Sequence, residues 1–355
     1  MSCSEASLKG IHTSSKFRIW VVKIKNFCNF EDYLKNNSMK NFQMIALWVL
    51  VLGLIGFTIY DKKFNQISYD TYQDGSWHQM QLIDFRIPEK LYFADEAVPL
   101  NDVGIRQRLD REFYNFIFGH AGTALTLKRA NYWLPRFEKI LLEMGVHPDF
   151  KYLPIIESNL SNAVSPAGAA GFWQIMPDVA PTYGLEVNTE VDERYHPIKS
   201  AYVAAKILKE NYQKFGSWAL AAAAYNAGAN YLEGVIAFQK QKSYYNLYLY
   251  PETARYVMRL IAFKNIYENP RKYGYAISPE NFYHFEPVKK IKITESITDL
   301  AEFAISQGIT YAKLIELNPW LRGKTLTIKN SKTYEIEIPY DATQLISKDS
   351  TTKIQ

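Results

Sequence analysis

The chain is poor in cysteine. Only Cys3 and Cys28 occur among its 355 residues, and both precede residue 41. The rest of the sequence has no thiol, which excludes disulfides, thiolate nucleophiles and zinc–thiolate sites from that part. Any chemistry beyond residue 41 must use other groups, such as carboxylates, imidazoles and hydroxyls.

Net positive charge is also small beyond the N-terminal segment. The formal net charge is +5, but residues 1–40 contain seven Lys and Arg against three acids, a net +4, which leaves +1 for the rest. A nucleic-acid-binding protein carries its basic patch on its folded domain. The charge distribution therefore argues against a nucleic-acid partner.

One long uncharged run is present, at residues 41–60. Twenty helical residues rise roughly 30 Å, the thickness of the hydrocarbon core of a bilayer. The basic flank predicts a single-pass membrane anchor, with residues 1–40 in the cytoplasm and the bulk of the chain outside it, in the periplasm or cell envelope. A cleaved signal peptide is the alternative, because Met39 could be the true start and the segment before it untranslated. No Ala-x-Ala-like site follows the run, which favours an uncleaved anchor.

Helical periodicity dominates the middle of the chain. Apolar residues recur at helical spacing in two segments before Gly145, which stands where a helix C-cap would. Residues 61–97 show little periodicity and are predicted to form a linker or entry segment. The helical segments are 101–120, 124–145, 199–215, 217–227 and 252–268.

The pattern changes near residue 285. An alternating segment, two short helical segments and a second alternating segment predict a small βααβ module over residues 285–340. Residues 268–284, rich in Pro, Gly and polar side chains, form the natural boundary. Residues 341–355 are predicted to be a flexible tail. The fold class expected for the whole chain is α+β, with a mainly helical domain first.

Glu157 is the first candidate for a catalytic role. It follows Ile155 and Ile156, and burial beside them at the end of a short helix would raise its pKa toward neutrality. A general acid needs this property. The small residues of "SPAGAAG" (165–171) would let a bulky substrate approach the backbone, and "FWQ" after them would supply a stacking face and an amide. A solvated helix terminus is the simpler interpretation of Glu157 taken alone.

Three motifs in order strengthen the catalytic interpretation: "ESNLSNAVSPAGAAGFWQIMP" (157–177), "YNAG" (225–228) and "ETARYV" (252–257). Together they resemble the lytic transglycosylases of the goose-lysozyme-like superfamily, of the membrane-bound murein transglycosylase D type. The resemblance covers residues 98–275 and implies a lysozyme-like, mainly α-helical catalytic domain.

The resemblance also implies a mechanism. Glu157 would be the only acid/base, cleaving the MurNAc-β-1,4-GlcNAc bond of peptidoglycan without water and leaving 1,6-anhydro-MurNAc ends. The substrate's N-acetyl group would take the place of a second carboxylate, and no cofactor would be needed. Two alternatives remain open: a hydrolytic lysozyme on the same fold, and a non-catalytic peptidoglycan-binding scaffold.

Further site residues carry over from the motifs. They would bind the sugar and its acetamido group, line the cleft, hydrogen-bond the catalytic carboxylate or position those groups. They are Ser165, Trp173, Gln174, Met176, Tyr225, Asn226, Glu252 and Tyr256.

Two of these positions, and one further motif, invite a more specific prediction. Glu252 is expected to fix the two tyrosines, or simply to begin a helix. Asn226 is expected mainly in a turn or in packing. In "DERYHP", Asp192 and Arg194 predict a structural ion pair and loop anchor, and no metal site is expected there or elsewhere.

The C-terminal module resembles a LysM domain, which binds chains containing N-acetylglucosamine. "LNPWL" (317–321) and the closing "IP" (338–339) carry the likeness, whereas residues 294–297 read Thr-Glu-Ser-Ile instead of the usual Gly-Asp-Thr-Leu. Glycan binding and a packing or partner-binding role both stay open for it. The expected partners are peptidoglycan strands, the inner membrane through the anchor, and cell-wall synthesis or division proteins.

Overall fold

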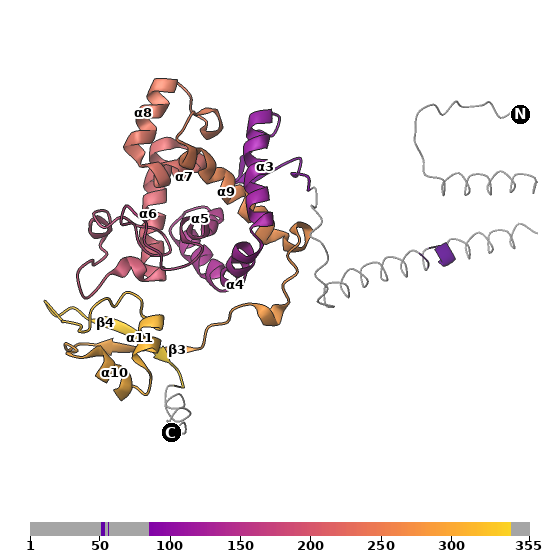
Figure 1. The fold of residues 1–355 in the computed structure, drawn as a ribbon. Helices are drawn as coiled ribbons and strands as arrows, with labels where there is room; N and C mark the ends of the chain where they lie inside the picture. Colours follow the sequence, from indigo (N-terminus) through magenta and orange to yellow (C-terminus); the bar gives the residue numbers. More distant parts are fainter. Residues whose placement is uncertain (1–50, 54–55, 57–84, 342–355) are drawn as a thin grey trace, which may run out of the picture. The chain divides into compact units, whose positions relative to one another are not determined.

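The computed structural model describes residues 51–53, 56 and 85–341 (Figure 1). Most of the predicted anchor at 41–60 and nearly all of the predicted tail lie outside the described residues. Within the described ranges, no helix combines the length and the hydropathy that a membrane span requires. The elements below belong to the compact unit that begins at Phe85.

Helices make up the larger part of this unit (Figure 1). The predicted helical segments are all present, although their ends shift by a few residues, and α8 was not predicted from the sequence. The α-helices are α3 (Val103–Phe118), α4 (His120–Glu143), α5 (Leu153–Ser158), α6 (Pro197–Phe215), α7 (Trp218–Ala227), α8 (Ala229–Gln239) and α9 (Pro251–Glu268). Short 3-10 turns join them: η2 (Pro148–Tyr152), η3 (Ala180–Tyr183), η4 (Glu193–Tyr195), η5 (Tyr244–Asn246), η6 (Pro270–Tyr273) and η7 (Pro279–Asn281).

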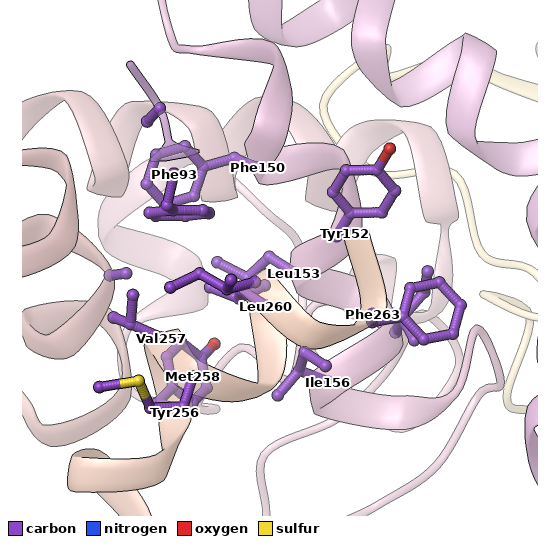
Figure 2. Close-up of a cluster of buried hydrophobic side chains, with 14 of the residues drawn as sticks. Phe93, Phe150, Tyr152, Leu153, Ile156, Tyr256, Val257, Met258, Leu260 and Phe263 are labelled. Atoms are coloured by element: carbon purple, nitrogen blue, oxygen red, sulfur yellow. The ribbon is translucent and has the colours of Figure 1, made fainter. Parts of the chain in front are cut away.

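Helix α9 forms the centre of the main core. It packs against α3, α5, α7 and η2, and Figure 2 shows its side chains among those of the segment that leads into α5. Val257, Leu260 and Phe263 on α9 are fully buried. The Ala-rich α7 lies against both α6 and α9, as the small side chains predict, because alanine lets helix backbones approach closely.

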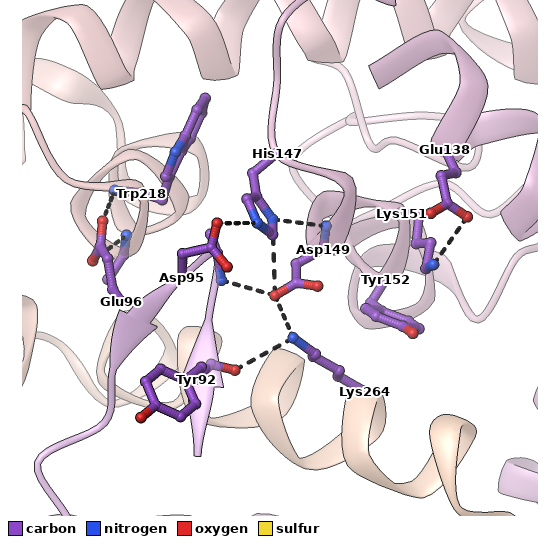
Figure 3. Close-up of polar contacts among 12 residues, drawn as sticks. Tyr92, Asp95, Glu96, Glu138, His147, Asp149, Lys151, Tyr152, Trp218 and Lys264 are labelled. Carbon is purple, nitrogen blue, oxygen red and sulfur yellow. Dashed lines mark hydrogen bonds and ion pairs between the residues drawn. The ribbon is translucent and has the colours of Figure 1, made fainter. Parts of the chain in front are cut away.

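The predicted linker before residue 97 needs correction at its C-terminal end. Phe93 is fully buried, and a short hairpin of β1 (Tyr92–Phe93) and β2 (Glu96–Ala97) belongs to the main core. The carboxylate of Glu96 accepts hydrogen bonds from the hydroxyl of Ser217 (2.8 Å) and from the backbone N–H of Trp218 at the start of α7 (Figure 3). A carboxylate at a helix N-terminus satisfies free N–H groups and complements the helix dipole.

The hairpin is also held at its turn. Asp149 accepts hydrogen bonds from the backbone N–H of Ala94 (2.8 Å) and from the ammonium group of Lys264 on α9 (2.6 Å), as Figure 3 shows. Strands of two residues are too short to show an alternating pattern, and the contacts that hold them come from distant parts of the chain. For this reason the sequence analysis did not identify the segment as packed.

The C-terminal module has the predicted βααβ order. Its elements are β3 (Val288–Ile293), α10 (Leu300–Ser306), α11 (Tyr311–Leu317) and β4 (Tyr334–Pro339). The strands pair antiparallel, from Val288 opposite Pro339 to Ile293 opposite Tyr334. The module has its own hydrophobic core, which also includes Val191, a residue of the preceding helical part.

Candidate active site

Glu157 lies in the last turn of α5, as predicted. The helix ends at once, because Asn159 (φ +52°) and Leu160 (φ +55°) both adopt the left-handed conformation. This conformation is uncommon for leucine and persists only where surrounding contacts impose it. Ser158 supplies one such contact, since its Oγ lies 2.9 Å from the carbonyl oxygens of both Pro154 and Phe172.

The electrostatic environment of Glu157 differs from that of an exposed carboxylate. Burial raises its pKa from the ordinary 4.5 to about 7. A hydrogen bond from Tyr256 and the charge of Arg259 oppose this rise, whereas the charge of Glu252 reinforces it. The sequence-based expectation of a desolvated carboxyl with a raised pKa is confirmed.

Three residues on one face of α9 act on the Glu157 carboxylate. Glu252, Tyr256 and Arg259 are spaced four and three residues apart, which places them on the same side of the helix. The hydroxyl of Tyr256, buried in the core, donates to Glu157 Oε1. Arg259 Nη2 donates to the carbonyl oxygen of Ile156 (3.2 Å). The sequence analysis did not select Arg259, although its spacing from Tyr256 carried the signal.

Residues 163–177 form a folded loop after α5. Isolated bridges join Ala170 to Val164 and to Ile175. Within the loop, Ser165 Oγ accepts a hydrogen bond from the N–H of Ala169 (3.0 Å). Met176 is 36% exposed. The sugar-binding roles of Ser165 and Met176 stay predictions, and the structure places both residues on this one loop.

Gln174 holds the same loop from within. It has a positive φ of +48°, and its Nε2 donates to the carbonyl oxygens of Ala163 (3.0 Å) and Gly171 (2.8 Å). The amide nitrogen therefore serves the loop backbone. Among residues 85–341 no hydrogen bond is made to the amide oxygen, so a contact of Gln174 with an acetamido group stays a prediction that would use this oxygen.

The expected stacking face of Trp173 is wrong. Trp173 is fully buried, its indole N–H donates to the carbonyl oxygen of Pro197 (3.3 Å), and its ring packs edge-on against Phe137. A sugar ring cannot reach it. Its large apolar surface is better buried in the core than exposed, which the sequence motif alone did not reveal. Its backbone carbonyl oxygen instead contacts a second candidate site residue, Tyr225.

That backbone contact also corrects the expectation for Tyr225. The hydroxyl of Tyr225 donates to the carbonyl oxygen of Trp173 (2.7 Å) and therefore cannot donate to Glu157. It still lies close enough to the carboxylate for the charge of Glu157 to act on it, and burial and this charge together raise the pKa of Tyr225. Of the two tyrosines, Tyr256 alone hydrogen-bonds Glu157.

Two residues near the start of α9 have more modest roles than a substrate contact. Glu252 is exposed in the first turn of α9, and within residues 85–341 no hydrogen bond joins it to either tyrosine. The position agrees with the alternative expectation of an acid that begins a helix, its charge acts on Glu157, and a role in fixing the tyrosines stays a prediction. Asn226 Oδ1 accepts a hydrogen bond from Thr253 (2.8 Å) and ties the end of α7 to α9, which fits the expected packing role.

The ion pair predicted in "DERYHP" is confirmed. Arg194 Nη2 lies 2.7 Å from Asp192 Oδ2, and both side chains are about nine-tenths buried. Arg194 Nη1 also donates to the carbonyl oxygens of Gly168 (2.8 Å) and Ile175 (3.2 Å), at two points of the 163–177 loop. Gly171 has φ +80°, and a Cβ there would lie 2.0 Å from the Arg194 carbonyl oxygen, so only glycine fits.

The histidine of that motif caps a helix. His196 Nδ1 accepts a weak hydrogen bond from the N–H of Lys199 at the start of α6 (3.4 Å). Burial lowers the pKa of His196 to about 4, so it is neutral at pH 7. In the part of the chain that the structure describes, no three His, Cys, Asp or Glu side chains are grouped so that they could hold a metal ion.

Comparison with known proteins agrees with this geometry. Residues 141–248 match the transglycosylase SLT domain family, and residues 289–342 match the soluble lytic transglycosylase C-terminal LysM-like domain. The membrane-bound lytic murein transglycosylase D of Escherichia coli K12 and that of Escherichia coli O6:H1 are each 28% identical to this chain over 244 residues. The match covers 66% of this chain and 52% of each relative, so the chain spans about half the length of these curated relatives.

A solved structure is also similar. The X-ray structure of an inactive mutant of the lytic transglycosylase Slt from Pseudomonas aeruginosa matches 40% of this chain and 24% of its own, at 22% identity and a TM-score of 0.30. The two domain matches and the curated relatives lead to one conclusion. The chain contains a transglycosylase SLT domain followed by a LysM-like C-terminal domain.

Proposed function

We propose that the chain is a peptidoglycan lytic transglycosylase and that Glu157 is its acid/base. One observation carries the proposal: a half-buried carboxyl with a pKa of about 7, hydrogen-bonded by Tyr256, lies inside the SLT domain. At neutral pH about half of such groups hold a proton. A general acid works best when its pKa is close to the working pH.

The first step uses the protonated form. Glu157 gives its proton to the glycosidic oxygen between MurNAc and GlcNAc, and the C1–O bond of MurNAc breaks. The carboxylate left behind is stabilised by the hydroxyl of Tyr256 and by the charge of Arg259, the two groups that lower its pKa. Both are in place before the reaction, so little reorganisation is needed.

The second step returns the proton. The ionised Glu157 removes the proton of the MurNAc 6-hydroxyl as that oxygen attacks C1, which closes a 1,6-anhydro ring without consuming water. Most retaining glycosidases use a second carboxylate as the nucleophile at C1, with exceptions in which a group of the substrate takes this role. Here the acid whose charge acts on Glu157 is Glu252, which is exposed at the start of α9. The proposal therefore assigns stabilisation of the positive charge to the substrate's N-acetyl group.

The location and partners follow from the same proposal. A peptidoglycan-cleaving enzyme acts outside the cytoplasmic membrane, which agrees with the anchor predicted at residues 41–60 and with the curated relatives, which are membrane-bound by name. Peptidoglycan strands are the proposed substrate. Proteins of cell-wall synthesis or division are proposed as partners.

Digestion of purified peptidoglycan by the full chain and by Glu157→Gln tests the proposal. The fragments are identified by mass spectrometry. We expect fragments lighter by one water, without a reducing end, which the variant does not release. Reducing-end fragments that depend on Glu157 would indicate a lysozyme instead. Sedimentation of the protein with peptidoglycan but no release of fragments would indicate a binding scaffold.

A further inference from the structure

The LysM-like module is tied to the helical domain by one loop. Residues 186–193 of the SLT domain lie against residues 320–334, between α11 and β4 of the module. Val191 is 1% exposed and belongs to the module's hydrophobic core. It also forms a bridge with Leu321. The SLT domain therefore completes the core of the module.

Polar contacts surround this apolar centre. The Glu190 carboxylate accepts hydrogen bonds from the hydroxyl of Thr325 and from the N–H of Thr327 (2.9 Å). The carbonyl oxygen of Glu190 accepts from the N–H groups of Arg322 (2.8 Å) and Gly323 (3.2 Å). The hydroxyl of Thr327 also donates to the carboxylate (3.0 Å), so five donors from one module loop converge on one residue of the SLT domain. A module tethered only by a linker would not need them.

A second acid extends the contact to β4. Glu186 accepts a hydrogen bond from the hydroxyl of Tyr334 (2.8 Å) and pairs with Lys332. Lys332 neutralises this carboxylate of the SLT domain, and Tyr334 hydrogen-bonds it. Burial raises the pKa of Glu186, but these two module residues outweigh that effect and lower the pKa.

The contact leads to the candidate active site through two residues. The backbone N–H of Asp192 donates to the carbonyl oxygen of Trp320 in the module (2.9 Å). The Asp192 carboxylate holds Arg194, and Arg194 donates to two carbonyl oxygens of the 163–177 loop. The module, the ion pair and the loop therefore form one continuous set of hydrogen bonds.

We propose that the LysM-like module is a fixed brace that positions the 163–177 loop of the SLT domain. It acts through residues 190–194, with Arg194 as the positioning residue. The inference rests on the proposed function for its effect on activity. Because residues 320–327 are occupied by the SLT domain, this face of the module is not free to bind glycan.

The test compares Glu190→Ala, Glu190→Gln and Val191→Asp in the full chain. Alanine removes the acceptor for Thr325 and Thr327, whereas glutamine can still accept and donate at these positions. Aspartate places a charge at the buried centre of the contact. Hydrogen exchange is measured for residues 163–177 and 318–327, together with the rate of fragment release from peptidoglycan. Glu316→Ala, on the exposed side of α11, is the matched control.

We expect Glu190→Ala and Val191→Asp to accelerate exchange in both segments and to slow fragment release about tenfold, since a displacement of about 1 Å can cost about 10²-fold and a smaller one costs less. Glu190→Gln should restore most of the rate, and Glu316→Ala should change neither quantity. Faster exchange at 318–327 with unchanged exchange at 163–177 would overturn the brace. Exchange does not depend on activity, so an inactive parent chain with the expected exchange pattern would refute the proposed function and support the brace.

Discussion

Two glutamates, Glu112 and Glu157, contact neighbouring residues of α9, and their pKa values shift in opposite directions. Glu112 on α3 is 1% exposed and receives two hydrogen bonds from Arg255, at 2.7 and 2.9 Å. Burial alone would raise its pKa, but the hydrogen bonds and charge of Arg255 lower it below the ordinary value. Glu157 receives a neutral hydroxyl from Tyr256, and burial raises its pKa to about 7.

The comparison separates the effect of burial on a carboxyl pKa from the effect of the hydrogen-bonding partner. Folding removes Glu112 from water and Glu157 partly so, and adjacent α9 residues decide what replaces the lost water. A guanidinium with two parallel hydrogen bonds stabilises the charged form of Glu112. A single hydroxyl and the nearby charge of Arg259 compensate only part of the desolvation of Glu157. The first pair ties α3 to α9, and the second leaves a carboxyl that can exchange its proton near pH 7.

The largest expected effect comes from removing the titratable group. Glu157→Gln should reduce fragment release from peptidoglycan by about 10³-fold or more, because general acid catalysis contributes 10²–10⁴-fold and Glu157 is proposed to act in both steps. The measurement is the release rate followed by mass spectrometry. Glu252→Gln is the control carboxyl, and it should retain far more activity. Equal losses in the two variants would contradict the assignment.

Breaking the charged pair should affect stability instead. Arg255→Met leaves the Glu112 carboxylate buried with Arg111 and Asn115 as its remaining partners, which should destabilise the fold by about 3 kcal/mol. Urea unfolding measures the change. The double variant Glu112→Gln, Arg255→Met removes the buried charge and should recover most of the loss. A single variant as stable as the parent would show that the pair contributes little.

The raised pKa of Glu157 predicts that the free energy of unfolding depends on pH. Because the pKa in the folded chain is above the ordinary 4.5, the protonated Glu157 contributes stability that is fully present below about pH 4.5 and is lost as the pH rises through about 7. The loss is on the order of 3 kcal/mol for a rise of this size. Glu157→Gln removes it, so its stability relative to the parent should improve between pH 5 and pH 8 in urea unfolding. A difference that is constant with pH would argue against the raised pKa.

The smallest expected effect concerns the hydrogen bond to Glu157. Tyr256→Phe removes a group that lowers the pKa, so the alkaline limb of the pH–rate profile should move to higher pH, and the fold should lose about 1 kcal/mol. Tyr225→Phe is the matched control, because that hydroxyl donates to Trp173 and not to Glu157. Its alkaline limb should stay in place. An equal shift in both variants would remove the distinction between the two tyrosines.

Local sequence predicted most of the elements in the described part of the chain. Helical spacing located α3, α4, α6, α7 and α9, and Gly145 and Gly228 end α4 and α7 with positive φ. The order of two alternating and two helical segments predicted the βααβ module. These features depend on neighbours within a few residues, so a pattern in the sequence is sufficient to find them. The hairpin at 92–97 was missed because its contacts are with residues 50 to 170 positions away.

The site divides in the same way. Local sequence was sufficient to place Glu157 near the end of a short helix after two isoleucines and to pair Asp192 with Arg194. The groups around Glu157, the burial of Trp173 and the contact of the module loop with Glu190 became visible in the folded chain alone. The reason is physical: a pKa, a buried ring or a shared core depends on atoms that the fold brings together from distant positions, and no local pattern encodes their distance.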